Sequence, residues 1–167
     1  MKKDFYLIEA INIVDYYNKI SAEKKNALPL KVSYAFKKAV DKMTPDVRRF
    51  EEFRDEEFKK IRDIYFTEER SYECQIPKVD DNGNPVLDEN GNQETAEGRK
   101  LKDEWQEEYS LAVQALDEKL KEIVVEKNTY EYNGVNVADM VENLPDDTPL
   151  QAADIELIDT ILDNSNE

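Results

Sequence analysis

Apolar residues recur at intervals of three and four over two long stretches of the chain, and this spacing restricts the fold more than any other feature. Residues at such intervals share one face of an α-helix. In the first stretch they are Val32, Ala35, Phe36, Ala39, Val40 and Met43. In the second stretch they are close to a seven-residue repeat, namely Leu101, Trp105, Tyr109, Ala112, Leu116, Leu120 and Ile123. Two long amphipathic helices are therefore predicted.

The predicted fold is mainly α, an elongated antiparallel helical hairpin with coiled-coil character. Its two segments would be residues 30–70 and a return helix from about Thr95 to Lys127. Pro45 suits the first turn of a helix, so the outgoing segment is either one helix that kinks there or two successive helices. An N-terminal helix would run from Asp4 to about Ile20 and pack on the hairpin. A C-terminal helix would begin at Thr148-Pro149.

Residues 71–94 depart from the helical pattern. They contain Asn82-Gly83 and Asn90-Gly91, and Asn-Gly pairs favour tight turns because both central positions need positive φ. A small β-hairpin or ordered loop is predicted here, and Asn133-Gly134 predicts a second short hairpin over 129–137. Residues 138–144 are expected to form one or two helical turns. No internal repeat is evident.

We expect two segments that pack as one domain. Residues 1–127 would form a helical domain with a β-hairpin or loop insert at 71–94. Residues 128–167 would add an acidic C-terminal β-hairpin and helix, packed on the same domain.

The composition argues against an enzyme. The 167 residues include no histidine and one cysteine, so the chain has no imidazole general base, no cysteine-based zinc site and no internal disulfide. None of the four glycines belongs to a phosphate-binding loop. Adjacent acidic pairs such as Glu51-Glu52 point in different directions on a helix, which is typical of a solvated surface. We predict no catalysis, no resident metal and no cofactor.

The acidic turns leave calcium binding open. When the loop is aligned on Gly83, Asp80, Asn82 and Glu89 match EF-hand ligand positions. The first ligand position is nevertheless Lys78, and in the alignment on Gly91 it is Val86. Ordinary turn chemistry is the favoured interpretation of both loops.

Charge is distributed unevenly along the chain. The formal net charge is −16, with +4 over residues 1–43, −10 over 44–127 and −10 over 128–167, where Lys and Arg are absent. This distribution disfavours direct nucleic-acid binding and suggests head-to-tail electrostatics within the molecule or between copies. The charge-interrupted N-terminal segment is not typical of a signal peptide, and no apolar run is long enough to cross a membrane, so no membrane association is expected.

Two regions are the predicted contact surfaces for protein partners. The first is the loop between Asn82 and Asn92, and the second is the acidic tail with two alternating tyrosines. The interface candidates are Asn82, Asn84, Asn90, Asn92, Tyr130, Tyr132, Asp146 and Asp147.

The run from Leu28 to Lys38, Leu-Pro-Leu-Lys-Val-Ser-Tyr-Ala-Phe-Lys-Lys, resembles a helix start in a family of short, acidic, helix-rich proteins from tailed phages and prophages of Gram-positive bacteria. The resemblance extends in element order over most of residues 5–162. It implies a phage protein that acts through protein–protein contacts, in the virion tail or in assembly, located in the host cytoplasm or the virion. The partner would be a phage structural protein, a host protein or another copy of the chain.

Two further interpretations remain. The acid-rich surface would also suit a DNA mimic that inhibits a host nucleic-acid-binding or defence protein. A third interpretation is a metal-dependent enzyme that uses carboxylates alone.

Overall fold

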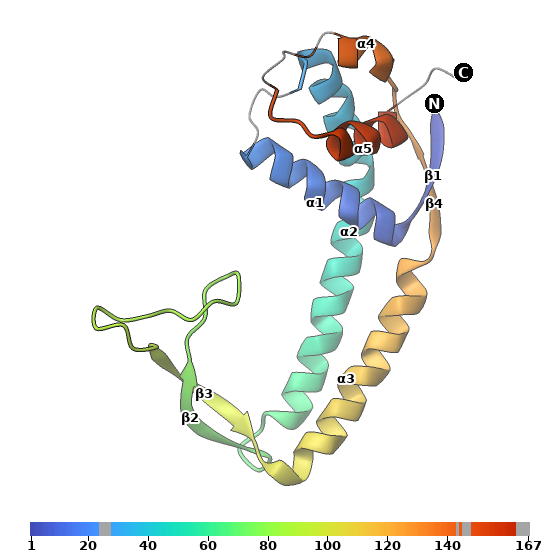
Figure 1. The fold of residues 1–167 in the computed structure, drawn as a ribbon. Coiled ribbons are helices and arrows are strands. Elements are labelled where there is room, and N and C mark those ends of the chain that lie inside the picture. Colours follow the sequence, from blue (N-terminus) through green and yellow to red (C-terminus); the bar gives the residue numbers. More distant parts are fainter. Residues whose placement is uncertain (24–27, 143, 145–147, 163–167) are drawn as a thin grey trace. The chain divides into compact units, whose positions relative to one another are not determined.

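The computed structural model describes residues 1–23, 28–142, 144 and 148–162. Over these residues it is mainly helical, with five helices and two small antiparallel sheets of two strands each, so the mainly α prediction is confirmed (Figure 1). The chain divides into two compact units. Unit 1 comprises Met1–Phe53 and Leu120–Glu167, and unit 2 comprises Arg54–Lys119. The predicted division after residue 127 lies inside unit 1.

Unit 1 contains a β-ladder between the N-terminus and a segment more than a hundred residues away. Strand β1 (Lys2–Tyr6) pairs antiparallel with β4 (Lys127–Glu131), with Asp4 opposite Thr129 (Figure 1). The predicted helix start at Asp4 is wrong, because the Asp4 carboxylate accepts a hydrogen bond from Thr129 Oγ1 at 2.7 Å instead of capping a helix. The predicted hairpin over 129–137 is also wrong, since β4 takes its partner from the N-terminus.

The core of unit 1 is assembled from helices distant in sequence. Helix α1 (Leu7–Glu23) packs on the first part of α2 (Leu30–Tyr65), where the Tyr17 ring meets the Phe36 ring edge-on at 5.2 Å. Helices α4 (Val137–Glu142) and α5 (Ala152–Leu162) complete this core. The fully buried side chains include Phe36, Met43, Val137, Ile158, Ile161 and Leu162.

Helix α5 begins slightly later than the Thr148-Pro149 signal predicts. The backbone N–H of Gln151 donates to Asp154 Oδ2 at 2.7 Å, so an acid in the first turn satisfies a free amide at the helix start. The one or two turns predicted near residues 138–144 are confirmed as α4.

Helix α2 continues through Pro45 as one 36-residue helix, so no second helix begins there. The ring nitrogen of Pro45 carries no hydrogen, so it cannot donate a hydrogen bond to a preceding carbonyl. Beside it, the Thr44 hydroxyl donates to the Val40 carbonyl at 2.8 Å. The helix passes from unit 1 to unit 2 after Phe53, and α3 (Asp103–Val124) returns after Lys119, so both connections between the units are helical.

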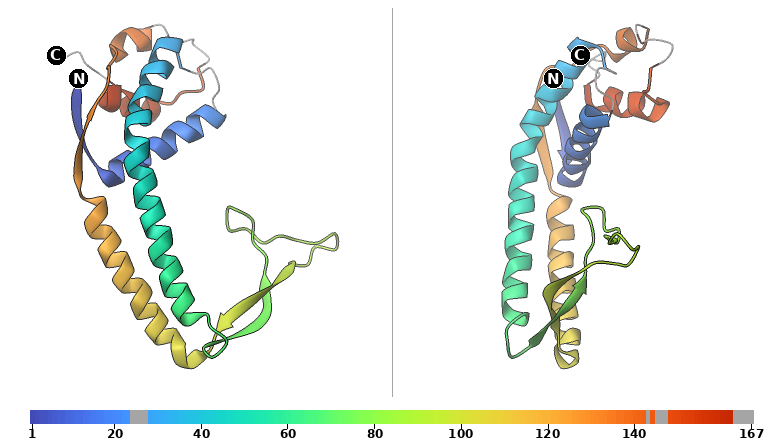
Figure 2. Two further views of the ribbon diagram at one scale, coloured as in Figure 1. Left: turned by 180° about the vertical axis from the view of Figure 1, so that it is seen from behind. Right: turned by 90° about the vertical axis from the view of Figure 1, so that its left-hand side faces the viewer.

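Unit 2 combines the end of α2 and the start of α3 with a second ladder. Strand β2 (Ser71–Pro77) pairs antiparallel with β3 (Thr95–Leu101), and Figure 2 shows this ladder from two further directions. The prediction of a helix from Thr95 is wrong, because residues 95–101 pair with β2. The centres of the Tyr65 ring, at the end of α2, and the Tyr109 ring, near the start of α3, lie 5.5 Å apart. The Tyr65 hydroxyl donates to the Glu108 carboxylate at 3.0 Å.

None of the described helices combines the length and the apolar character needed to cross a lipid bilayer.

Candidate interaction surface

Residues 71–101 form a β-arm that extends from the ends of α2 and α3 and carries two loops (Figures 1 and 2). We call this segment the arm, and we call residues 79–94 within it the double turn. The double turn contains all four asparagines that the sequence predicted as contact residues, Asn82, Asn84, Asn90 and Asn92, and all four are exposed.

The two loops of the double turn have the same hydrogen-bond pattern. In the first, Asp80 Oδ1 accepts the backbone N–H groups of Asn82 at 2.9 Å and Asn84 at 2.8 Å. In the second, Asp88 Oδ1 accepts those of Asn90 at 2.8 Å and Asn92 at 2.9 Å. A carboxylate that bonds successive backbone amides is the mechanism by which Asp favours turns.

Glycine closes each loop. Gly83 and Gly91 have φ angles of 81° and 80°, a region that side chains with a Cβ rarely adopt. Each donates its backbone N–H to the carbonyl of the leading aspartate, at 2.9 Å for Gly83 and 3.0 Å for Gly91. The sequence Asp-acid-Asn-Gly-Asn thus occurs twice, starting at Asp80 and Asp88. The chain thus contains a short internal repeat here, and the expectation that it has none is wrong.

Three backbone hydrogen bonds connect the two loops to each other. The N–H of Lys78 donates to the carbonyl of Glu94 at 2.7 Å. The N–H of Glu94 donates to the carbonyl of Val86 at 2.8 Å, and the N–H of Val86 donates to the carbonyl of Lys78 at 3.0 Å. These bonds close a ring where the loops meet the β2–β3 ladder. The backbone of the double turn is consequently well satisfied although its surface is exposed.

The double turn is strongly acidic. It holds five acidic residues and neither Lys nor Arg. Backbone hydrogen bonds from Asn84 lower the pKa of Asp80, and those from Asn92 lower the pKa of Asp88, because they stabilise the charged carboxylate. Both turn-forming aspartates are therefore ionised at neutral pH.

The carboxylates of Asp80 and Asp88 already accept hydrogen bonds within their own turns. Over the described residues, no cluster of three or more acidic or cysteine side chains has a geometry that could hold a metal ion. The structure thus assigns these aspartates to turn formation and does not gather them into a shared ligand set.

Large apolar side chains lie exposed on the arm. Val79 and Leu87, at equivalent places before the two turns, expose 57% and 58% of their surface. Tyr72 and Ile76 of β2 are exposed as well. Exposed apolar side chains that gather on one element can form a surface for contact with another macromolecule.

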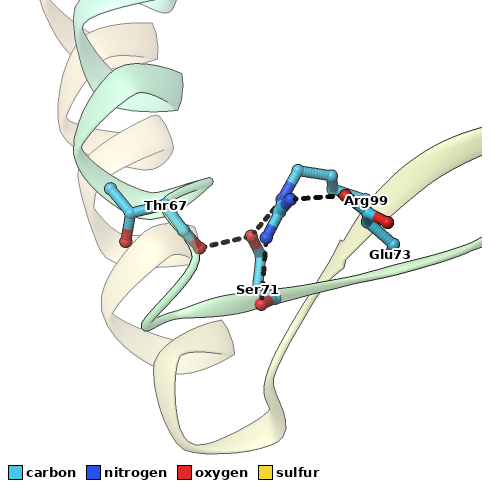
Figure 3. A network of polar contacts seen from close by, with 4 residues as sticks. All are labelled: Thr67, Ser71, Glu73 and Arg99. Atoms are coloured by element: carbon cyan, nitrogen blue, oxygen red, sulfur yellow. Dashed lines mark hydrogen bonds and ion pairs between the residues drawn. The ribbon is translucent and has the colours of Figure 1, made fainter.

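A polar network holds the base of the arm to the end of α2 (Figure 3). The buried Ser71 hydroxyl donates to the Thr67 carbonyl at 2.6 Å and accepts from Arg99 Nε at 2.9 Å. Arg99 also contacts the Glu73 carboxylate at 3.4 Å. Because Arg99 comes from β3 and Thr67 follows α2, these bonds join both strands of the arm to the helix end.

The two tyrosines of the second predicted contact region do not lie at the surface. Tyr130 and Tyr132 are both buried in unit 1, so their assignment as interface residues is corrected. The Tyr130 hydroxyl donates to Asp46 Oδ2 at 3.0 Å, and burial together with this carboxylate raises the pKa of Tyr130 to about 12. The Tyr132 hydroxyl donates to the Ile161 carbonyl at 2.7 Å. Asp146 and Asp147 lie outside the described residues.

In comparisons with known proteins, no family model, no curated protein and no solved structure matches the chain.

Proposed function

We propose that this is a non-catalytic protein that works through protein–protein contacts, and that the arm is its contact surface. The observation that carries the proposal is the double turn, which presents exposed Val79 and Leu87 on a backbone fixed by its own hydrogen bonds. An element ordered before binding loses little conformational entropy when it binds. Such order in an exposed segment is well suited to recognition.

The chemistry of the double turn defines the kind of partner. Its acidic side chains require basic groups on the opposite surface, and Val79 and Leu87 require small apolar depressions between them. The contact would combine an apolar centre with a charged rim, as protein interfaces commonly do.

The resemblance to phage proteins supports a role in the virion tail or in assembly. In this role α2 and α3 would form an antiparallel helical hairpin that carries the arm. The packing of Tyr65 on Tyr109 in unit 2 supports this arrangement, since the end of one helix meets the start of the other there.

DNA mimicry is the second candidate, favoured by the ten acidic residues and the absence of Lys and Arg over residues 128–167. Two contacts in unit 1 weaken it. Lys2 Nζ lies 3.7 Å from Glu131, and Lys3 Nζ donates to the Thr160 carbonyl at 2.7 Å. Cations thus lie beside the segment that would have to present an uninterrupted negative face.

The test is quantitative mass spectrometry of particles purified from the phage or prophage whose genome encodes the chain. Wild-type protein is expected in a fixed stoichiometric ratio to other virion proteins. The double variant Val79→Ser/Leu87→Ser should be reduced about tenfold in the particles, which corresponds to about 1.4 kcal/mol of lost binding free energy.

Leu111→Ser/Val125→Ser is the matched control, because each of these side chains is 60% exposed and neither lies on the arm. Equal incorporation of both double variants would contradict the role of the arm. Absence of the wild-type protein from particles, together with salt-sensitive capture of a basic host protein, would favour the mimic instead.

A further inference from the structure

Unit 1 contains a basic groove that the proposed function does not use. The hollow has a volume of about 560 Å³, and one wall consists of Lys31, Tyr34, Lys38 and Lys42 of α2. The opposite wall is formed by residues 131–135 and Met1. We call this hollow the lysine groove.

Helical spacing explains why these side chains lie together. Positions 31, 34, 38 and 42 follow one another at intervals of three and four, so they form a single stripe on α2. The intervening apolar residues Ala35 and Ala39 are buried in the core of unit 1. Lys38 Nζ lies 5.5 Å from the centre of the Tyr34 ring, a cation–π contact on a residue that is 62% exposed.

The lysines of the groove lack carboxylate partners among the described residues. The neighbouring Lys37, by contrast, lies 3.2 Å from Asp41. Glu131 is the one acid among the described residues of the groove wall, and its carboxylate lies 3.7 Å from Lys2 Nζ on the adjacent strand. In a chain of net charge −16, three neighbouring lysines that have no acidic partner in the part of the chain that the structure describes form a local site for an anionic group.

The chain itself carries a surface of the complementary kind. The double turn is acidic throughout, and Asp81 and Glu89 are exposed at equivalent positions of its two loops. Unlike Asp80 and Asp88, these two side chains do not form the turns, so they can pair with lysines without disturbing the loops. Val79 and Leu87 supply the apolar contact that the exposed Tyr34 ring would accept.

We propose that the double turn of one copy docks in the lysine groove of a second copy. This inference rests on the proposed function, because it names the partner of the arm. The two surfaces are different, so a pair of copies would still have one free groove, on one copy, and one free arm, on the other. Such a head-to-tail contact adds copies in succession and forms an open chain or a ring instead of stopping at a symmetric dimer.

Ionic strength decides how the net charge of the copies affects this contact. At about 0.15 M salt the Debye length is about 8 Å, so repulsion between distant charges is screened while directly paired charges still attract. Self-association should therefore be measured near this ionic strength and should weaken at about 1 M salt, where the Debye length is about 3 Å.

The experiment is sedimentation velocity of the full chain over a concentration series, with charge-reversal variants. Lys38→Glu/Lys42→Glu reverses the groove, and Asp81→Lys/Glu89→Lys reverses the double turn. Wild-type protein should form species larger than a dimer as concentration rises. Each variant alone should associate at least about tenfold more weakly, because two attractive pairs become repulsive. An equimolar mixture of the two variants should associate again, since each then meets a complementary surface.

Lys19→Glu/Lys119→Glu is the control, because it makes the same change in net charge at exposed lysines outside the groove. It should associate like the wild type. A wild-type protein that stays monomeric overturns the inference, as does a mixture of the two variants that fails to recover association.

Incorporation into particles separates this inference from the proposed function. If Val79→Ser/Leu87→Ser is lost from particles while Lys38→Glu/Lys42→Glu leaves self-association unchanged, the arm contacts a different protein. In that case only the self-docking inference fails.

Discussion

The hydroxyl group of Tyr132 connects two distant parts of unit 1, because it donates to the Ile161 carbonyl at 2.7 Å in a buried setting. Tyr132→Phe should lower the free energy of unfolding by about 1–2 kcal/mol, since the carbonyl loses its side-chain partner away from water. Urea denaturation would measure the change. Tyr34→Phe serves as the control and should change stability by less than about 0.5 kcal/mol, because Tyr34 is exposed. An equal loss in both variants would contradict this role.

The two turn-forming aspartates predict a response to acid. The folded-state pKa of Asp80 and of Asp88 lies below the ordinary value of 3.8. The ionised carboxylates therefore stabilise the turns above pH 3.8, and this stabilisation is lost as the pH falls through the lower folded-state pKa. The amide resonances of Asn84 and Asn92 in NMR spectra should shift together as the turns open.

Asp88→Asn provides an internal control for this titration. The variant should remove the acid response of Asn92 and leave that of Asn84, because each aspartate bonds only its own loop. Loss of both responses in the single variant would show that the loops do not form independently.

At the scale of elements, Arg99 is predicted to hold the arm in place. Arg99→Met keeps the apolar stem of the side chain and removes the bonds to Ser71 and Glu73. The β2–β3 amides should then exchange with solvent about fivefold faster, equivalent to about 1 kcal/mol, while amides of unit 1 keep their rates. Lys100→Met removes an exposed charge from the next residue and should have little effect. Equally faster amide exchange in Arg99→Met and Lys100→Met would mean that loss of a positive charge, and not loss of the hydrogen bonds of Arg99, loosens the arm.

The elements that could be predicted from sequence are those with local signals. The spacing of Val32, Phe36 and Met43 is sufficient to predict α2, because an amphipathic helix is encoded within a few turns. Strand β1 could not be predicted in this way, since its partner β4 is distant in sequence and its five residues include one buried side chain, Phe5. Residues 95–101 likewise become a strand only through pairing with β2.

The same difference between local and distant signals explains why the contact residues of the double turn could be located from sequence and the burial of the two tyrosines could not. The Asn-Gly pairs identified the double turn, because turn chemistry is local. Tyr130 and Tyr132 alternate along the chain, which places both on one face of a strand, but alternation does not reveal whether that face meets solvent or a core. This face is buried because it packs against helices from elsewhere in the chain. The repeat in the double turn was visible in the sequence as two copies of Asp-acid-Asn-Gly-Asn.

For the whole molecule, net charge predicts the response to salt. At a net charge of −16, long-range repulsion opposes the folded state, while ion pairs such as Lys2–Glu131 and Lys37–Asp41 are exposed and individually weak. Raising sodium chloride from about 0.01 M to about 0.15 M shortens the Debye length from about 30 Å to about 8 Å and should raise the melting temperature. Circular dichroism at pH 7 and low protein concentration would measure the melting temperature at each salt concentration. A melting temperature that falls with salt would show that attractive pairs dominate.

The closed hydrogen bonding of each loop has a consequence for the evolution of the chain. Asp80 donates its N–H to the Asn84 carbonyl at 2.8 Å, and Asp88 does the same with Asn92 at 2.7 Å, so each loop closes its own turn. Eight residues could be duplicated or deleted here if the bonds among Lys78, Val86 and Glu94, which join the loops to the ladder, are formed again by the remaining loops. Descendants of a common ancestor could in this way lengthen or shorten the projection, and change the number of acidic tips it offers, while the rest of the protein stays the same.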